Sequence, residues 1–242
     1  MVGRSGYCSS MAALERVLDA LATVHGEPQP PRDRTILELV LLENVAYLVD
    51  DARREESFRD LQTRVGTRPE QILAAPDEAL LAVTGRGILA EPQSGKLRRA
   101  ASLAVGDDLD RLRQLPLRQA KRVLERFPGI GEPGAERVLL FARAHPVLGL
   151  DSNGIRVLCR LGLLAEGSSY SATYRAAQAA MAQYSTRGFE WLIRAHRLLR
   201  RHGQQLCRRT VPLCQECPLT DRCRYYLGAG RRFAGDGQVP GG

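Results

Sequence analysis

Residues 124–157 read LERFPGIGEPGAERVLLFARAHPVLGLDSNGIRV, and this stretch decides the fold. Its Phe127-Pro-Gly-Ile-Gly131 segment separates two helical patterns, 117–126 and 132–144, and glycines there permit a tight turn and close approach to a partner. The second helix follows at once, so its free N–H groups point outward, where a phosphate can sit. Asp151 then immediately precedes another helical pattern, 152–161. We therefore predict a helix-turn-helix unit followed by a helix with an acidic start.

The sequence on both sides of this stretch is also helical in pattern. Further helices are predicted over 14–24, 35–51, 96–104, 172–184 and 189–202, with short ones starting at Pro69 and Pro76. The 35–51 segment is mostly apolar, so we expect a buried core helix there. No run alternates with period two, which predicts an all-α protein without a substantial sheet. The glycine-rich tail, 229–242, is expected to be disordered.

Length and charge limit the class of protein. The 242 residues suffice for one large domain or two modest ones, and the formal net charge is +8. This surplus favours a polyanionic partner, nucleic acid first and an acidic membrane second. No apolar run is long enough for a transmembrane helix, and no secretory signal is evident, so we expect a cytoplasmic protein. Arginine supplies the basic charge almost alone, because Lys96 and Lys121 are the only lysines.

Four of the six cysteines gather near the C-terminus. Cys207, Cys214, Cys217 and Cys223 are separated by six, two and five residues. Four thiolates in one compact loop suit a soft metal centre, either zinc or a [4Fe-4S] cluster. The uneven spacing and a proline after the third cysteine favour the cluster, while two disulfides or unrelated free thiols are the alternatives. Cys8 and Cys159 stand apart and are expected to be inert.

The cysteine spacing resembles the iron–sulfur loop of the endonuclease III family of DNA glycosylases. The 127–131 turn resembles the helix-hairpin-helix of that superfamily, and Leu150-Asp151-Ser152-Asn153 resembles the motif around its catalytic aspartate. These matches cover roughly residues 33–226. The resemblance implies an all-α, two-lobed HhH-GPD fold with a [4Fe-4S] cluster that has a structural or DNA-docking role.

The resemblance also implies a domain organisation and a partner. One domain, 33–146, is a six-helix-type bundle that ends in the hairpin, and residues 1–32 with 147–228 form the cluster-bearing helical domain. The implied partner is double-stranded DNA with a damaged or mismatched base, and we expect a monomer located at the bacterial nucleoid. Residues expected to contact DNA in this region are Gly129, Ile130, Gly131, Gly134 and Asn153.

Asp151 is the candidate catalytic residue on chemical grounds as well. Cleavage of an N-glycosidic bond builds positive charge on the sugar, and a nearby carboxylate stabilises that charge and can help a water molecule to attack. The simpler interpretation is a helix N-cap, for which aspartate is a favoured residue. One aspartate can fill both roles.

The chain departs from the family at the nucleophile. Bifunctional members carry a lysine just after the hairpin, and the matching residue here is Pro133, which has no amine. The resemblance therefore implies a monofunctional glycosylase that uses water. The alternatives are a glycosylase/AP lyase with a non-standard lysine, Lys96 or Lys121, and a non-catalytic DNA lesion-binding protein.

A second departure lies in the 35–51 segment, where relatives carry a glutamine-rich stretch that fills the gap left by an extruded base. Asn44 is the candidate wedge here, with Glu43 as a partial replacement. Glu38 is similar in place to the catalytic glutamate of adenine mismatch glycosylases and could protonate a leaving base, or it could be an ordinary surface residue. Arg86 and Lys96 are candidates for contact with phosphate or the opposite base, and ordinary surface charge is the alternative.

Overall fold

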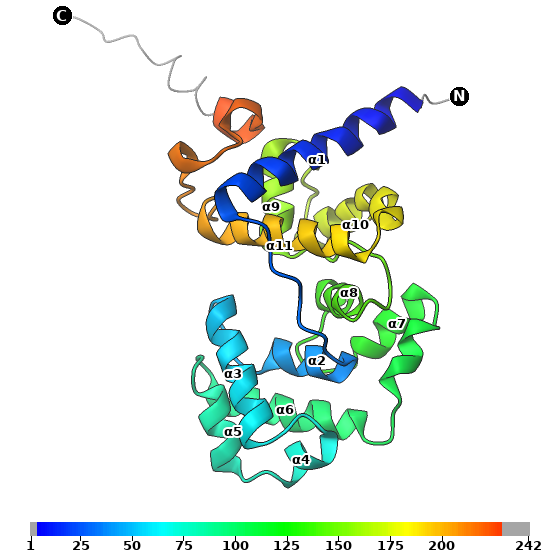
Figure 1. Ribbon diagram of the computed structural model, residues 1–242, viewed down its shortest axis with the longest axis vertical. Helices are drawn as coiled ribbons and strands as arrows, with labels where there is room; N and C mark the ends of the chain where they lie inside the picture. The colour runs from blue at the N-terminus through cyan, green and yellow to red at the C-terminus, as the bar shows by residue number, and fades with distance from the viewer. Residues whose placement is uncertain (1–3, 229–242) are drawn as a thin grey trace, which may run out of the picture. The chain divides into compact units, whose positions relative to one another are not determined.

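A computed structural model describes the backbone of residues 4–228 and the side chains of residues 12–228. The predicted disordered tail, 229–242, and Cys8 lie outside the described residues. The chain divides into two compact units, one formed by residues 31–149 and the other by residues up to 30 together with those from 150 onward. Each unit has its own helices (Figure 1).

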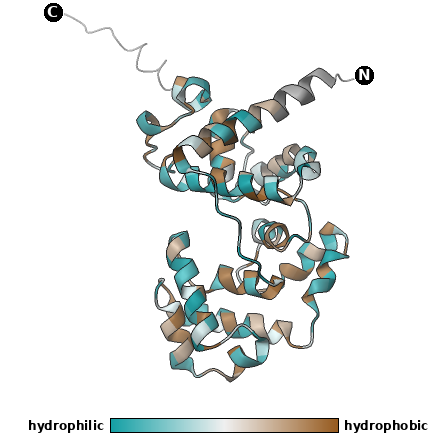
Figure 2. Ribbon diagram, in the orientation of Figure 1, coloured by the Kyte–Doolittle hydropathy of each residue, from teal (hydrophilic) through white to brown (hydrophobic). Residues whose placement is uncertain are grey.

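The 31–149 unit is a helical bundle built around α2. Val40 and Leu41 of α2 are fully buried, and α2 packs against α3, α6 and α8. This helix carries mostly hydrophobic residues (Figure 2). Its elements are α2 (Ile36–Asn44), α3 (Asp51–Arg64), α4 (Pro69–Ala74), α5 (Asp77–Thr84), α6 (Ala90–Ala104), a 3-10 helix (Leu109–Arg113), α7 (Leu117–Leu124) and α8 (Glu132–Phe141).

The predicted single helix over 35–51 is wrong, because the chain leaves the helix after Asn44. The Asn44 side chain donates to the Val40 carbonyl, and Leu48 has a left-handed backbone with φ 54°. Asp50 then caps a new helix, α3, by accepting a hydrogen bond from the Arg53 N–H at 2.8 Å. The strongly polar α3 was not predicted, since it has few apolar residues to mark a buried face.

The other unit packs α11 between α9 and α1. Two glycines let α9 and α11 approach closely. A Cβ on Gly203 would lie 2.7 Å from the Asn153 Cβ, and one on Gly154 would lie 3.5 Å from the Leu199 Cβ. The elements are α1 (Arg4–His25), α9 (Ser152–Leu161), α10 (Tyr170–Met181), a 3-10 helix (Ala182–Arg187), α11 (Phe189–Gln205) and two further 3-10 turns (Cys214–Glu216 and Thr220–Arg222).

The all-α prediction is confirmed. Residues 4–228 contain no β-strand, and their one isolated bridge joins Tyr47 to Ile88. Among the described helices, none is long and apolar enough to cross a membrane.

Candidate active site and DNA-binding hairpin

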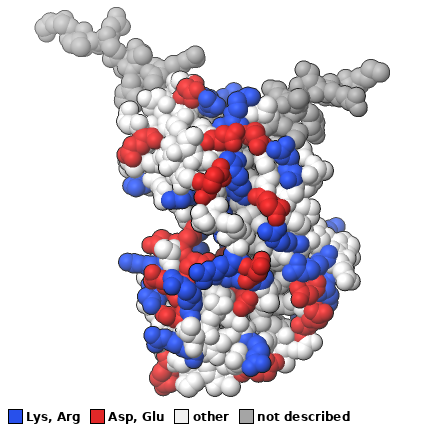
Figure 3. Space-filling model, viewed as in Figure 1, with Lys and Arg blue, Asp and Glu red and all other residues white. Residues whose placement is uncertain are grey.

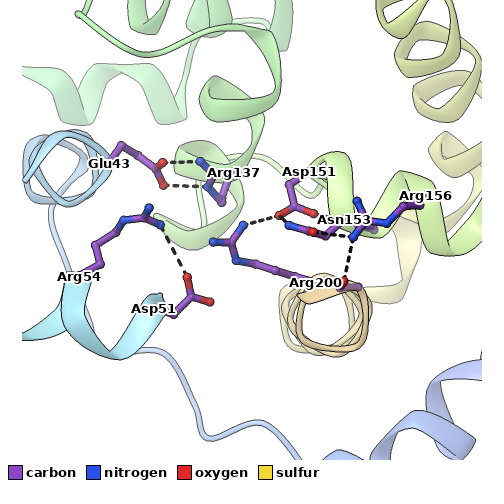
Figure 4. Close-up of polar contacts among 10 residues, drawn as sticks. Glu43, Asp51, Arg54, Arg137, Asp151, Asn153, Arg156 and Arg200 are labelled. Carbon is purple, nitrogen blue, oxygen red and sulfur yellow. Dashed lines mark hydrogen bonds and ion pairs between the residues drawn. The ribbon is translucent and has the colours of Figure 1, made fainter. Parts of the chain in front are cut away.

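Asp151 occupies the N-terminus of α9 with its carboxylate turned inward. The residue is only 7% exposed. Its Oδ1 accepts a hydrogen bond from the Gly154 N–H at 2.8 Å, which makes it the N-cap of α9. Its Oδ2 accepts one from the Asn153 amide at 3.0 Å and forms an ion pair with Arg200 of α11. Asp151 is therefore the helix N-cap that the simpler interpretation predicts. Its second carboxylate oxygen is buried beside the positive charge of Arg200 (Figure 4).

The Asp151 carboxyl is ionised despite its burial. Removal from water raises its pKa, but the positive charges of Arg200 and His196 outweigh this, and hydrogen bonds from Gly154 and Asn153 add to their effect. The result is a pKa well below the usual range of an aspartate. At neutral pH the site therefore presents a carboxylate, which can accept a proton or face a developing cation and cannot act as an acid.

Arg156 joins this site to the cysteine loop. Its guanidinium donates to the Asn153 side-chain oxygen at 2.8 Å, to the Gly203 carbonyl at 2.8 Å and to the Cys207 carbonyl at 2.9 Å. Asn153 in turn donates to Asp151, as Figure 4 shows for Arg156, Asn153 and Asp151. A continuous chain of hydrogen bonds therefore runs from the first cysteine of the loop to the carboxylate.

The hairpin turn is held from inside its unit by Asn44. Gly129 has φ +72°, and a Cβ there would lie 2.7 Å from the Asn44 Oδ1, so this position requires glycine. The Asn44 amide donates to the Pro128 carbonyl at 2.9 Å. The predicted wedge role of Asn44 does not fit this position, because the residue is 0% exposed and supports the turn instead of reaching outward.

The start of α8 after the turn has no side-chain cap. Gly131 is its N-cap residue, Gly134 lies in its first turn, and Ile130 is buried beneath the turn. Because glycine has no side chain, the N-cap residue supplies no cap to the first backbone N–H groups of the helix, which is the setting that the sequence predicts for a phosphate site. Pro133 is tolerated at this end of a helix because its missing N–H is not needed there.

Lys121 of α7 is engaged by two glutamates of α8. Its Nζ donates to Glu132 at 2.6 Å and to Glu136 at 2.9 Å, and its side chain is only 13% exposed. Burial lowers the pKa of the Lys121 ammonium, but the two carboxylates more than offset this and raise it overall. A protonated amine is not a nucleophile, so this lysine is a cross-link between the two hairpin helices.

The two acids of α2 are also engaged. Glu38 forms a capping box with Thr35, and its other oxygen accepts from the Thr67 hydroxyl at 3.1 Å. These bonds give Glu38 a structural role, and they do not support the predicted transfer of a proton to a leaving base. Glu43 makes a two-pronged ion pair with Arg137 of α8 (Figure 4).

Two loops of the 31–149 unit form an exposed apolar knob, which we define as Tyr47, Leu48, Ile88 and Leu89. Leu48 and Leu89 both have left-handed backbones, with φ 54° and 61°, and are 71% and 54% exposed. The Tyr47–Ile88 bridge joins the loops, and the Lys96 ammonium lies 5.8 Å above the Tyr47 ring. Nothing in the local sequence pattern indicated this knob, since only the backbone reveals its strained, outward leucines.

Arg86 lies beside the knob and is paired within the unit. It donates to Asp60 at 2.7 Å and to Glu56 at 3.4 Å on α3. Its charge is therefore partly compensated, unlike that of an arginine reserved for phosphate. On the face shown in Figure 3, basic and acidic side chains are similarly interspersed.

The four clustered cysteines are free thiols, and two of them, Cys207 and Cys223, contact Arg160. This arginine donates to the Cys207 sulfur at 3.4 Å, and its carbonyl lies 3.5 Å from the Cys223 sulfur. His202 Nε2 lies 3.6 Å from the Cys217 sulfur. The disulfide alternative is wrong, because the described cysteines form no disulfide. Cys159 is also a free thiol, half-buried in α9.

The donor set suits a multi-iron cluster. Burial and then the charges of neighbouring cysteines, Cys223 and Cys207, raise the pKa of the Cys214 thiol, and the same groups act on Cys217. Such mutual repulsion of thiolates is what a bound metal centre relieves. Within residues 12–228, no three His, Cys, Asp or Glu side chains converge on the position of a single metal ion. A [4Fe-4S] cluster takes one cysteine ligand on each of its four irons, so the four cysteines of this loop match the number of ligands that it needs.

The sequence of the chain is similar to those of known endonuclease III proteins. No family model matches the chain. The chain is 26% identical to endonuclease III of Sulfolobus acidocaldarius over 196 residues, which cover 80% of this chain and 82% of that protein. Of other similar proteins the chain spans less: 46% of endonuclease III of Rickettsia prowazekii, at 31% identity over 104 residues.

Solved structures share the whole fold. A trapped endonuclease III–DNA covalent intermediate matches with a TM-score of 0.69 at 20% identity, over 91% of this chain and 98% of the other. A thermostable thymine-DNA glycosylase matches with a TM-score of 0.68 at 17% identity, over 93% and 99%. The fold and its hairpin thus define a helix-hairpin-helix protein of the endonuclease III type. Together with the sequence relatives, they support the assignment of the chain to the HhH-GPD family of DNA glycosylases.

Sequence reasoning missed the partners of the site residues. The sequence gives no sign that Arg200 pairs with an aspartate 49 residues away. The Glu43–Arg137 pair joins residues that are 94 positions apart. No periodicity or motif encodes such long-range pairs, so only the structure reveals them.

Proposed function

We propose that this protein is a monofunctional DNA glycosylase that hydrolyses the N-glycosidic bond of a damaged or mismatched base, with Asp151 as the catalytic carboxylate. The observation that carries the proposal is the buried, ionised Asp151 at the start of α9, in a chain with the endonuclease III fold. A carboxylate held out of water acts strongly on a cation that develops on the sugar, and it can accept a proton from an attacking water molecule.

The lysines support hydrolysis over Schiff-base chemistry. The position that carries a lysine in bifunctional relatives is Pro133, and Lys121 is protonated and held by Glu132 and Glu136. Lys96 lies over the Tyr47 ring, where its ammonium faces an aromatic surface. We therefore expect AP lyase activity to be weak.

The hairpin and the knob are the proposed contacts to double-stranded DNA. The uncapped N-terminus of α8 after Gly131 offers backbone N–H groups to a phosphate. Tyr47, Leu48, Ile88 and Leu89 form the kind of apolar projection that proteins insert between base pairs when they kink a duplex, and Lys96 places a cation beside it. A base extruded from a kinked duplex then becomes available to a recessed carboxylate.

A panel of lesion-bearing duplexes tests the function. Duplexes with an oxidised pyrimidine, uracil or thymine opposite guanine, adenine opposite an oxidised guanine, or an alkylated purine are incubated with the protein and analysed with and without alkali. We expect strand breaks on one class of duplex only after alkali, because hydrolysis leaves an intact abasic strand. Breaks of equal yield without alkali would refute the monofunctional proposal, and no breaks on any duplex would refute the glycosylase.

We also propose that Cys207, Cys214, Cys217 and Cys223 hold a [4Fe-4S] cluster, which would tie the C-terminal loop together as a covalent scaffold. Protein purified without oxygen is expected to be brown, with about four irons per chain and broad absorbance near 400 nm. Replacement of Cys217 by serine should remove most of the iron, whereas Cys159→Ser, a matched change at a cysteine outside the loop, should not. A colourless protein that contains one zinc would contradict the proposal.

A further inference from the structure

The packing of α9 on α11 sets one arginine against the Asp151 carboxylate. Gly154 lies against Leu199, and Gly203 lies against Asn153, at distances that leave no room for a side chain on Gly203. These two contacts fix how α11 lies along α9. Arg200 follows Leu199 directly, and the fixed register brings its guanidinium to the Asp151 Oδ2.

The charges around this carboxylate are few and come from two helices. Arg200 and His196 of α11 act on the carboxylate. Arg156 of α9 acts on it from farther away, since it donates to Asn153, which in turn donates to Asp151. Among these, Arg200 makes the direct ion pair, and its side chain is 18% exposed. Arg156 donates its hydrogen bonds to Asn153, Gly203 and Cys207. Arg200 is therefore the main counter-charge at the oxygen that is not used for the cap.

Burial and this ion pair act in opposite directions. A carboxyl group out of water favours its neutral, protonated form, and a protonated Asp151 would neither carry negative charge nor accept a proton from water. The guanidinium reverses this preference and fixes the orientation of Oδ2, because a second donor, Asn153, holds the same oxygen. The pair thus allows a buried aspartate to remain a carboxylate.

We propose that Arg200 is a positioning residue of the active site, which keeps the buried Asp151 charged and oriented for its action on the sugar. The proposal rests on the proposed function, because it gives Asp151 the catalytic role. A merely structural contact between α9 and α11 would not affect the charge of Asp151. If the proposal is right, a site without Arg200 should act only at a pH high enough to ionise the aspartate.

The test measures the charge on Asp151 through a cationic DNA mimic, so no base has to be identified. One duplex carries a protonated pyrrolidine ring in place of a deoxyribose, and a matched duplex carries a neutral tetrahydrofuran. The ratio of the two dissociation constants is measured at pH 5 and pH 8 for the wild type, Arg200→Met, Arg200→Gln and Arg200→Lys.

We expect the wild type and Arg200→Lys to prefer the cationic duplex by the same factor at both pH values. The Asp151 pKa is depressed in the folded protein, so its charge persists down to pH 5. The two neutral variants should keep the preference at pH 8 and lose about tenfold or more of it at pH 5. Without the charge of Arg200, burial raises the Asp151 pKa, and His196 and the two remaining hydrogen bonds offset this only in part.

Each outcome decides between the two proposals. Asp151→Asn should abolish the preference at both pH values; if it does not, the catalytic assignment of Asp151 fails. If Asp151→Asn abolishes the preference but Arg200→Met and Arg200→Gln behave like the wild type, the role of Arg200 fails alone. If neither neutral variant folds, as judged by circular dichroism, Arg200 has a structural role and the proposal is overturned as well.

Discussion

Asp151→Asn is expected to reduce base release by about a thousandfold, equivalent to about 4 kcal/mol of activation free energy. The reason is the loss of charge: an amide cannot stabilise a cation on the sugar as a carboxylate does. Single-turnover kinetics on the duplex that the wild type cleaves fastest measures the effect, because product release then does not limit the rate.

The variant is well matched because asparagine is as good a helix N-cap as aspartate. The bond to the Gly154 N–H can be retained, and affinity for an undamaged duplex should change little. Its main structural cost is an Arg200 without its counter-charge, which the double variant Asp151→Asn with Arg200→Met removes. If the single variant retained base release near the wild-type level, Asp151 would be only a cap.

Pro133→Lys is expected to convert the protein into one that forms a covalent adduct with abasic DNA. The substitution places an amine at the position that carries the nucleophile in bifunctional relatives, directly after the hairpin. The helix does not need proline at this position, because the first turn of α8 has ordinary helical backbone that lysine can also adopt. Borohydride trapping, which reduces a Schiff base to a stable link, measures the adduct on a denaturing gel.

The wild type and Pro133→Gln are the controls, and neither should give more than a trace of trapped product. Lys121→Gln tests the remaining lysine of the hairpin, and we expect it to leave trapping at the same low level because the ammonium is bound by Glu132 and Glu136. A strong adduct with the wild type that disappears in Lys121→Gln or Lys96→Gln would show that the protein uses a non-standard lysine.

The sequence predicts the parts of this protein whose signals are local. Helix 152–161 is predicted to the residue, since Asp151 caps its start and Gly162, with φ 79°, ends it. The break after Asn44 escapes prediction because it falls within an otherwise continuous apolar run, and one contact made there by the Asn44 side chain is to the Pro128 carbonyl, 84 residues away. The sequence locates Asp151, but its charge state is set by Arg200, which a different helix supplies.

The tethering of the hairpin has a consequence for its encounter with DNA. The Asn44 side chain donates a hydrogen bond to the turn, and the ion pairs of Lys121 connect its two helices. The backbone amides of the turn are therefore in place before any ligand binds. A loop that had to become ordered on binding would lose about 1–2 kcal/mol of conformational entropy for each residue that it fixes. This preorganised turn avoids that loss. Contacts to phosphates do not depend on base sequence, so the turn can bind any stretch of duplex with similar affinity, which suits a protein that encounters long tracts of intact DNA before it meets a faulty base.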